Sequence, residues 1–139
     1  MIDSILDQTI SVKLGRNSQL VFGIITVGGK VITCNLDADF NQGGSHGAFY
    51  GLSRLGGDTA VTYDFTANHR VGNSTSHQLF KSIISARSVS THNTRVYVAK
   101  HAQETYTHQM SNHIMLSPRA KAYSKPELDI LADDVKCGH

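Results

Sequence analysis

Two adjacent glycines, Gly28 and Gly29, stand between two short apolar segments and narrow what this sequence can form. The flanking residues 24–27 and 30–33 are rich in β-branched side chains, which favour pleated strands. Both glycines can adopt the positive φ angles that a two-residue hairpin turn requires. The pattern therefore predicts a β-hairpin over residues 24–33.

Further strands are predicted around this hairpin. Residues 10–14 alternate apolar and polar side chains, and a turn at 15–18 precedes residues 20–22, so an N-terminal antiparallel meander is expected. Strands are also expected at residues 60–65, 78–87 and 94–101, and within 105–116. The glycine-rich segment 43–57 lacks the pattern of a P-loop or a dinucleotide-binding loop. We interpret it as an ordered surface loop held by its aromatic residues.

The C-terminal segment carries the signals of a helix. Ser124 and Glu127 have the spacing of a capping box, and Pro126 is tolerated in a first helical turn. An apolar stripe at helical spacing follows, and Gly138 ends it; the stripe consists of Leu128, Leu131, Ala132 and Val135. The expected fold is therefore α+β, mainly β, with an antiparallel sheet, an N-terminal hairpin and a C-terminal helix.

Residues 79–101 are interpreted as a second hairpin with two distinct faces. If Ser85 lies opposite Arg95, one face is apolar and the other is basic. The basic face could bind single-stranded RNA through phosphate contacts and a tyrosine that stacks on a base. The predicted RNA-binding residues are Lys81, Ser85, Arg87, Arg95, Tyr97 and His101. The alternative is an ordinary solvent-exposed face of a sheet, which is also polar.

Length and charge fit one folded domain over residues 1–139. The formal net charge is only +2, but residues 81–125 contain seven Lys or Arg against one acid, Glu104, so an anionic partner is plausible. No segment is long and apolar enough to span a membrane, and the N-terminus does not resemble a signal peptide.

Cys34 and Cys137 are too far apart in sequence for a disulfide framework or a metal-binding Cys motif, so two free thiols in a reducing compartment are expected. Cys34 lies on a predicted strand and is expected to be buried and inert. Cys137, at the end of the predicted helix, is expected to be the more reactive thiol.

The eight histidines do not form a recognisable metal site, because no pair has a ligand spacing in a matching element. Ser45 and His46 are neighbours, but adjacency does not make a catalytic triad. We therefore expect no catalytic residue, no metal ligand, no cofactor and no enzymatic activity.

The order of elements over residues 78–136 resembles the coat proteins of single-stranded RNA bacteriophages of the levivirus type. The similarity lies in a strand ending at Ser85-Ala86-Arg87, a polar tip at 88–93, a second strand at 94–100, another strand and a C-terminal helix. The resemblance implies a homodimer with one continuous sheet, whose inner face binds RNA and whose outer face is covered by helices of the partner.

The resulting hypothesis is a capsid protein that self-assembles into an icosahedral shell and packages RNA, with no membrane partner. The resemblance places it in the virion, and in the host bacterial cytoplasm during assembly. An alternative is a cytoplasmic β-rich carbohydrate- or peptide-binding module that uses the glycine-rich segment with Phe49 and Tyr50. A third possibility is a small hydrolase or metalloenzyme built on the histidines.

Overall fold

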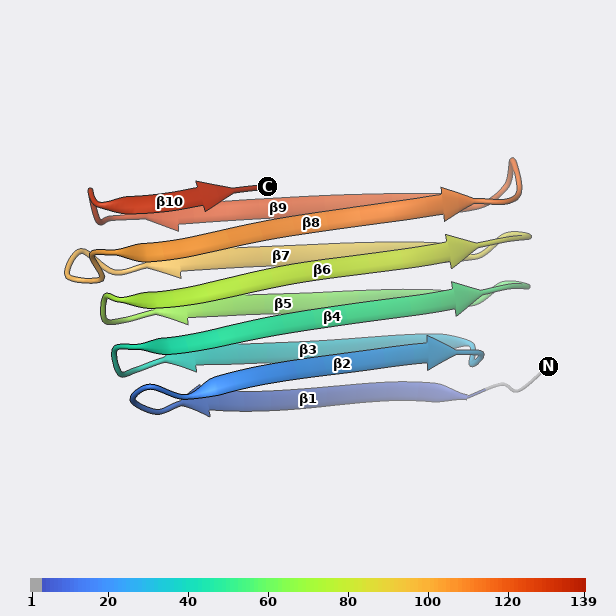
Figure 1. Ribbon diagram of the computed structural model, residues 1–139. Coiled ribbons are helices and arrows are strands. Elements are labelled where there is room, and N and C mark those ends of the chain that lie inside the picture. The colour runs from blue at the N-terminus through green and yellow to red at the C-terminus, as the bar shows by residue number, and fades with distance from the viewer. Residues whose placement is uncertain (1–3) are drawn as a thin grey trace.

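The computed structural model describes residues 4–139, and these form ten β-strands and no helix (Figure 1). The strands are β1 (Ile5–Leu14), β2 (Gln19–Val27), β3 (Val31–Phe40), β4 (Ser45–Leu55), β5 (Ala60–His69), β6 (Ser74–Ile84), β7 (Val89–Val98), β8 (Thr105–Met115), β9 (Lys121–Ile130) and β10 (Val135–Gly138).

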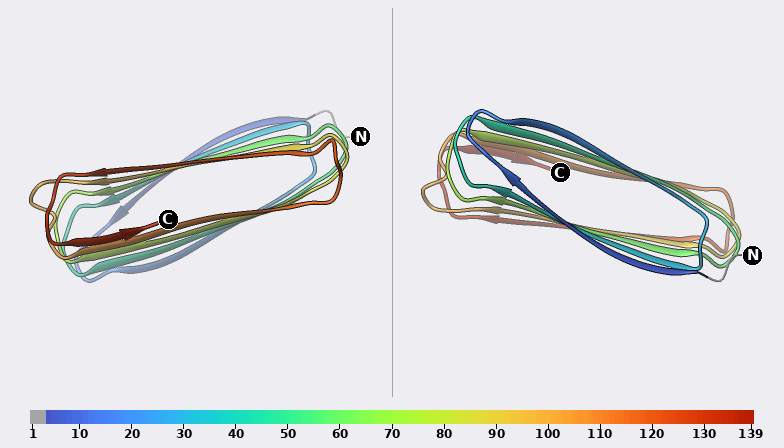
Figure 2. Two further views of the ribbon diagram at one scale, coloured as in Figure 1. Left: turned by 90° about the horizontal axis from the view of Figure 1, so that it is seen from above. Right: turned by 90° about the horizontal axis from the view of Figure 1, so that it is seen from below.

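The ten strands form two parallel sheets in which each strand pairs with the next but one along the chain. The odd-strand sheet has the order β1-β3-β5-β7-β9, and the even-strand sheet has the order β10-β8-β6-β4-β2. The chain therefore coils back and forth between the two layers, as a flattened β-solenoid (Figure 2). Residue 60 lies beside residue 31 and residue 89 beside residue 60, so one coil takes 29 residues here.

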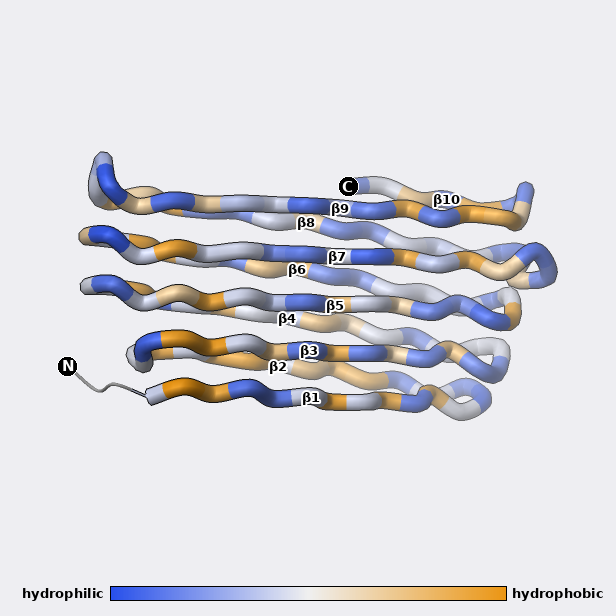
Figure 3. Tube along the Cα trace, turned by 180° about the vertical axis from the view of Figure 1, so that it is seen from behind, coloured by the Kyte–Doolittle hydropathy of each residue, from blue (hydrophilic) through white to orange (hydrophobic). Residues whose placement is uncertain are grey.

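Alternation of side chains along each strand creates the core between the two sheets. In β3, β4 and β5 every second residue is buried, and the residues between them face outward. In β3 and β5 the buried residues are mostly apolar and the outward ones mostly polar, and Figure 3 shows this as a change of colour along these two strands. Aromatic rings from both layers meet inside: Phe49 and Phe65 lie 4.9 Å apart between ring centroids, and Phe65 and Phe80 lie 5.8 Å apart. Burial of these large rings is a main source of stability.

One turn type recurs at one end of the coils. Each copy has a residue with positive φ followed by a hydroxyl side chain that donates a hydrogen bond to the carbonyl three residues earlier. The pairs are Asn17-Ser18, Gly44-Ser45, Asn73-Ser74 and Glu104-Thr105. Backbone hydrogen bonds also join one turn to the next, such as Gly44 N–H to the Asn73 carbonyl at 2.6 Å. The turns therefore stack in register and define the repeat, which is typical of solenoids.

The predicted antiparallel hairpins are wrong. Gly28 and Gly29 do have positive φ angles, but they link β2 to β3, which lie in opposite sheets. The segment 79–101 likewise divides between β6 in the even-strand sheet and β7 in the odd-strand sheet. A turn of the same local conformation can reverse the chain within a sheet or between two layers, and local sequence does not distinguish these outcomes.

The predicted C-terminal helix is also wrong, because residues 121–130 and 135–138 are β9 and β10. β9 pairs with β7 in parallel over its whole length, and this pairing decides its conformation. Leu128 and Ile130 are partly buried against the core and alternate with exposed residues, whereas Leu131 of the predicted helical stripe is 52% exposed. Pro126 lies in β9, the outermost odd strand that the structure describes, where a missing amide proton is tolerated.

The glycine-rich segment is a strand rather than a surface loop. β4 contains Gly47 and Gly51, and a side chain at either position would collide with buried rings of the core, those of Phe49 and Phe80 respectively. These glycines therefore provide room for aromatic rings inside the solenoid.

Candidate functional site

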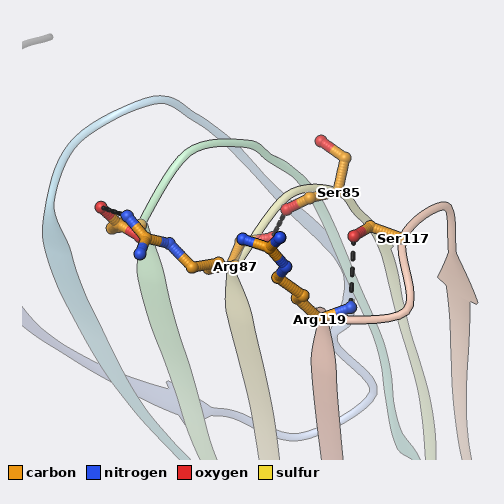
Figure 4. A network of polar contacts seen from close by, with 6 residues as sticks. Ser85, Arg87, Ser117 and Arg119 are labelled. Carbon is orange, nitrogen blue, oxygen red and sulfur yellow. Dashed lines mark hydrogen bonds and ion pairs between the residues drawn. The ribbon is translucent and has the colours of Figure 1, made fainter.

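The structure does not bring the six predicted RNA-binding residues together. Lys81 points outward from β6 in the even-strand sheet, while Arg95 and Tyr97 point outward from β7 in the other sheet. Ser85 and Arg87 lie in the β6–β7 turn (Figure 4), and His101 lies in the β7–β8 turn. Five residues of the predicted apolar face are buried, namely Phe80, Ser82, Ile84, Val96 and Val98, whereas Ala86 and Lys100 of that face are exposed. The two outward faces nevertheless belong to different layers.

Two of these arginines already have carboxylate partners on the neighbouring coil. Arg87 forms an ion pair with Asp58 at 2.8 Å, and Arg95 forms one with Glu127 at 2.6 Å. A cavity of about 240 Å³ beside Arg95 is lined by Asp64 as well as by basic groups. The surface around Arg95 therefore carries both charge signs, which weakens its attraction for a polyanion. RNA contact by the six side chains stays a prediction.

The interior contains a column of polar side chains between the two layers. Thr26 and Tyr63 share a hydrogen bond of 2.6 Å across the core. Toward the C-terminal end of the solenoid, His113 of β8 is hydrogen-bonded through Nδ1 to Ser82 of β6. Its Nε2 is hydrogen-bonded to Ser124 of β9 at 2.8 Å.

Two fully buried imidazoles belong to this interior. Burial lowers the pKa of His69 to about 4, and burial together with the nearby His113 lowers the pKa of His92 to about 3. Both rings are therefore neutral near pH 7. Their neutral state suits them to structural hydrogen bonding, as in the bonds from His69 to Ser74 and Ser76 at 2.7 and 2.8 Å.

The two cysteines differ in exposure. Cys34 is 4% exposed in β3, which confirms its predicted burial. Cys137 is partly buried in β10, in register with Thr107 of β8, and not at the end of a helix. Burial raises the pKa of both thiols. Cys137 is thus the more accessible sulfur atom of the two.

Cys137 lies in β10, and a second potential ligand, His139, follows directly after that strand. Cys137 packs against the core, Gly138 stands beside His108, and His139 follows at the end of the strand. Alternation along an extended chain places residues 137 and 139 on the same side. His139 accordingly lines a cavity of about 190 Å³ together with Gln109 and Ser124.

The cavity also contains an unsatisfied polar atom. Gln109 is 2% exposed, and its Oε1 accepts no hydrogen bond. A buried oxygen without a partner is uncommon and is expected to gain from a ligand or a bound water. His139 and Gln109 line this cavity together, and Cys137 lies two residues before His139, in register with Thr107 of β8. Thiolate and imidazole are ligands that proteins use for zinc and copper as well as for iron and iron–sulfur clusters.

The sequence carries a signal for this pair, but a predicted helix conceals it. A Cys-X-His spacing places both donors on one side of a strand, whereas in a helix the same residues point in nearly opposite directions.

Within residues 4–139, no group of three or more His, Cys, Asp or Glu side chains is arranged to hold a metal ion. No helix in this part of the chain is long and apolar enough to cross a membrane.

Comparisons with known proteins give one consistent family. The model of the SufBD core domain of the SUF system for FeS cluster assembly matches residues 3–139. An iron–sulfur cluster assembly SufBD family protein of Synechocystis is 30% identical over 141 residues, which cover 99% of this chain and 30% of that protein. SufD of Escherichia coli is 38% identical over 71 residues, covering 51% of this chain and 17% of that protein.

A chloroplastic protein of Arabidopsis thaliana, ABCI7, is 43% identical over 67 residues, covering 46% of this chain and 14% of that protein. The chain thus spans less than a third of the length of each of these relatives. The prediction that residues 1–139 form one domain stays a prediction.

These findings overturn the coat-protein hypothesis. The resemblance depended on an antiparallel hairpin and a C-terminal helix, and neither element exists in the part of the chain that the structure describes. The icosahedral shell, the dimer with a continuous sheet, the packaged RNA and the location in a virion were implied by that resemblance, and they are wrong with it. The alternative of a carbohydrate- or peptide-binding module is not supported either. By the match over residues 3–139, the chain belongs to the SufBD core family of iron–sulfur cluster assembly proteins.

Proposed function

We propose that this chain is a scaffold that holds iron or a nascent iron–sulfur cluster during assembly, with Cys137 and His139 as ligands. The cluster is the cargo of the protein and not a permanent cofactor. The proposal keeps the sequence-based expectation that the chain is not an enzyme: its residues bind and release the cluster. Association with other proteins of the SUF system is part of the proposal, because the family model is that of a SUF component.

The observation that carries the proposal is the Cys137-Gly138-His139 sequence at the end of β10. An extended chain directs residues 137 and 139 to one side, and His139 lines the cavity that contains the unsatisfied Gln109. Residues two apart on a strand have Cα atoms roughly 6.6 Å apart. Side chains that leave an extended chain on the same side at this spacing can converge on one iron atom or on one edge of a small cluster.

Parallel strands give the site rigidity. Cys137 is held by the β10–β8 pairing, and β8 is in turn paired with β6 along its length. Ligands fixed on regular strands are positioned more precisely than ligands on loops. A scaffold needs such positioning but also needs weak enough binding to release its cargo, and a two-ligand site supplied by one chain meets that need.

The raised pKa of Cys137 has a consequence for loading. The thiol is protonated near neutral pH, and iron must displace that proton because the thiolate is the ligand form. Cluster binding is therefore expected to release a proton and to strengthen as pH rises.

Anaerobic reconstitution with ferrous iron and sulfide tests the proposal. The parent chain should acquire visible thiolate-to-iron absorption and retain iron and sulfide after desalting. Cys137→Ser should lose most of this absorption, and His139→Ala should lower retained iron. Cys34→Ala is the matched thiol control and should load like the parent. Equal loading of the parent and Cys137→Ser would contradict the proposed ligand role.

A further inference from the structure

The outer face of the even-strand sheet is unusually apolar. Outward residues of β2, β4, β6 and β8 align in four rows across the strands. The rows are Val21-Ala48-His77-His108, Gly23-Tyr50-Leu79-Met110, Ile25-Leu52-Lys81-Asn112 and Val27-Arg54-Ile83-Ile114. We call these four rows the apolar face.

Several side chains of the apolar face are widely exposed. Val21 is 76% exposed, Ile25 is 74% exposed and Ile114 is 56% exposed. With roughly 4.8 Å between strands and roughly 3.3 Å per residue, the four rows cover about 450 Å². Eleven of the sixteen residues in these rows are apolar or glycine, and exposed apolar surface concentrated on one face commonly marks an interaction site.

The apolar face also differs in charge from the outer face of the odd-strand sheet. The five strands of the even-strand sheet contain no Asp or Glu at any position. The apolar face carries two exposed cations, Arg54 and Lys81, on adjacent strands β4 and β6. Among residues 4–139, neither has a carboxylate within ion-pair distance.

The odd-strand sheet is different on its outer side. It contains six acidic residues, Asp7, Asp37, Asp39, Asp64, Glu127 and Asp129. Its cation Arg95 is ion-paired with Glu127, and Lys125 pairs with the same carboxylate. The two outer faces of one solenoid thus differ in both apolar content and charge.

We propose that the apolar face docks an amphipathic helix that carries carboxylates beside its apolar stripe. An apolar sheet face must be buried against another element, and the apolar stripe of an amphipathic helix is one element that packs on the side chains of a sheet. Carboxylates on the flanks of the stripe would pair with Arg54 and Lys81. The aliphatic rows, led by Val21, Ile25 and Leu52, favour such a stripe over the stacked bases of a nucleic acid.

The inference is independent of the proposed cluster ligands. Cys137 points toward the core from β10, whereas the apolar face lies on the outer side of β2, β4, β6 and β8. A negative result in the cluster-loading experiment therefore does not contradict the docking proposal. A negative result in the docking experiment likewise does not contradict the proposed cluster ligands.

A matched pair of designed peptides tests the proposal with the chain as it exists. Both peptides are 18-residue amphipathic helices with the same leucine stripe, flanked by Glu in one and by Lys in the other. Fluorescence anisotropy should show about tenfold or tighter binding of the Glu peptide. Amide shifts in NMR spectra should fall on β2, β4, β6 and β8.

The test variant reverses the two cations, Arg54→Glu with Lys81→Glu, and should shift the preference toward the Lys peptide. The control variant, Lys13→Glu with Lys121→Glu, changes two exposed cations of the odd-strand sheet and should bind like the parent. Circular dichroism confirms that both variants are folded. Equal binding of the two peptides, no binding, or shifts on the odd-strand sheet would overturn the proposal.

Two further outcomes would identify a different occupant. If Leu52→Glu converts a dimer of the parent into a monomer in sedimentation experiments, a second copy of the chain covers the face. If the parent chain binds anionic phospholipid vesicles but does not bind the Glu peptide, the face binds a lipid surface. Either result would refute the helix proposal.

Discussion

Gly51 gives the sharpest test of how the core of the solenoid is packed. A Cβ atom at this position would lie 2.8 Å from Cε1 of Phe80 and 3.3 Å from Cε2 of Tyr63. Phe80 is 2% exposed, and its ring also packs against Phe65 with 5.8 Å between centroids, so it has little room to move. We expect Gly51→Ala to lower the free energy of unfolding by about 1–3 kcal/mol, the usual cost of overpacking a core.

Urea denaturation followed by circular dichroism measures this effect. With a denaturant dependence of about 2 kcal/mol per molar, the unfolding midpoint should fall by about 0.5–1.5 M. Gly23→Ala is the matched control in the adjacent strand β2, where an added Cβ meets no heavy atom within 4 Å. That control should be neutral or more stable, because alanine restricts the unfolded chain. Similar midpoints for the two variants would refute the packing of Phe80 against β4.

Three further predictions follow from the buried and paired groups. His69 and His92 have pKa values near 4 and 3 in the folded chain, below the ordinary 6.5. Between these folded-state values and pH 6.5, the unfolded chain therefore binds more protons than the folded chain. Stability should therefore fall as pH drops below about 6.5, by up to about 1.4 kcal/mol per pH unit for each histidine, and unfolding curves without this slope would contradict it. Labelling with a thiol reagent should modify Cys137 before Cys34 in the folded chain, and the reverse order would be inconsistent with the burial of Cys34 in β3. Arg87→Gln should cost less than about 1 kcal/mol in thermal or urea unfolding, because its ion pair is exposed, and a larger loss would show that the turn itself depends on it.

The candidate site is only partly accessible from the sequence. Cys137 can be singled out as the more reactive thiol, but the predicted helix ends at Gly138, before His139. Helical spacing would in any case separate the two side chains by about 200° around the axis. Only the strand conformation of β10 places both side chains on one side. Gln109 joins them because β8 and β10 are paired, although some 30 positions separate the two strands in sequence.

The repeat of the solenoid is visible in the sequence once the turns are known. Gly44-Ser45 and Asn73-Ser74 recur 29 residues apart, and each places a residue with positive φ before a hydroxyl that closes the turn. The signal is weak because stacked interior positions carry different residue types: Phe49 stacks over Gln78 in the next coil, and Leu36 over Phe65. Stacked positions share burial and strand geometry but not residue type.

Where a strand was predicted, the sequence by itself determined which side chains share a face, because alternation along a strand is a local property. Alternation alone separates Phe80, Ile84 and Val96 from Lys81 and Arg95, and the burial of the first three agrees with it. Only the tertiary structure decided which strands pair and in which direction. Hydrogen bonds of β6 go to β4 and β8, about 30 residues away on either side, and not to β7, which follows directly. An alternating strand presents the same backbone donors and acceptors to any neighbour, so its partner is selected by the stacking of the whole coil and not by the residues next to it.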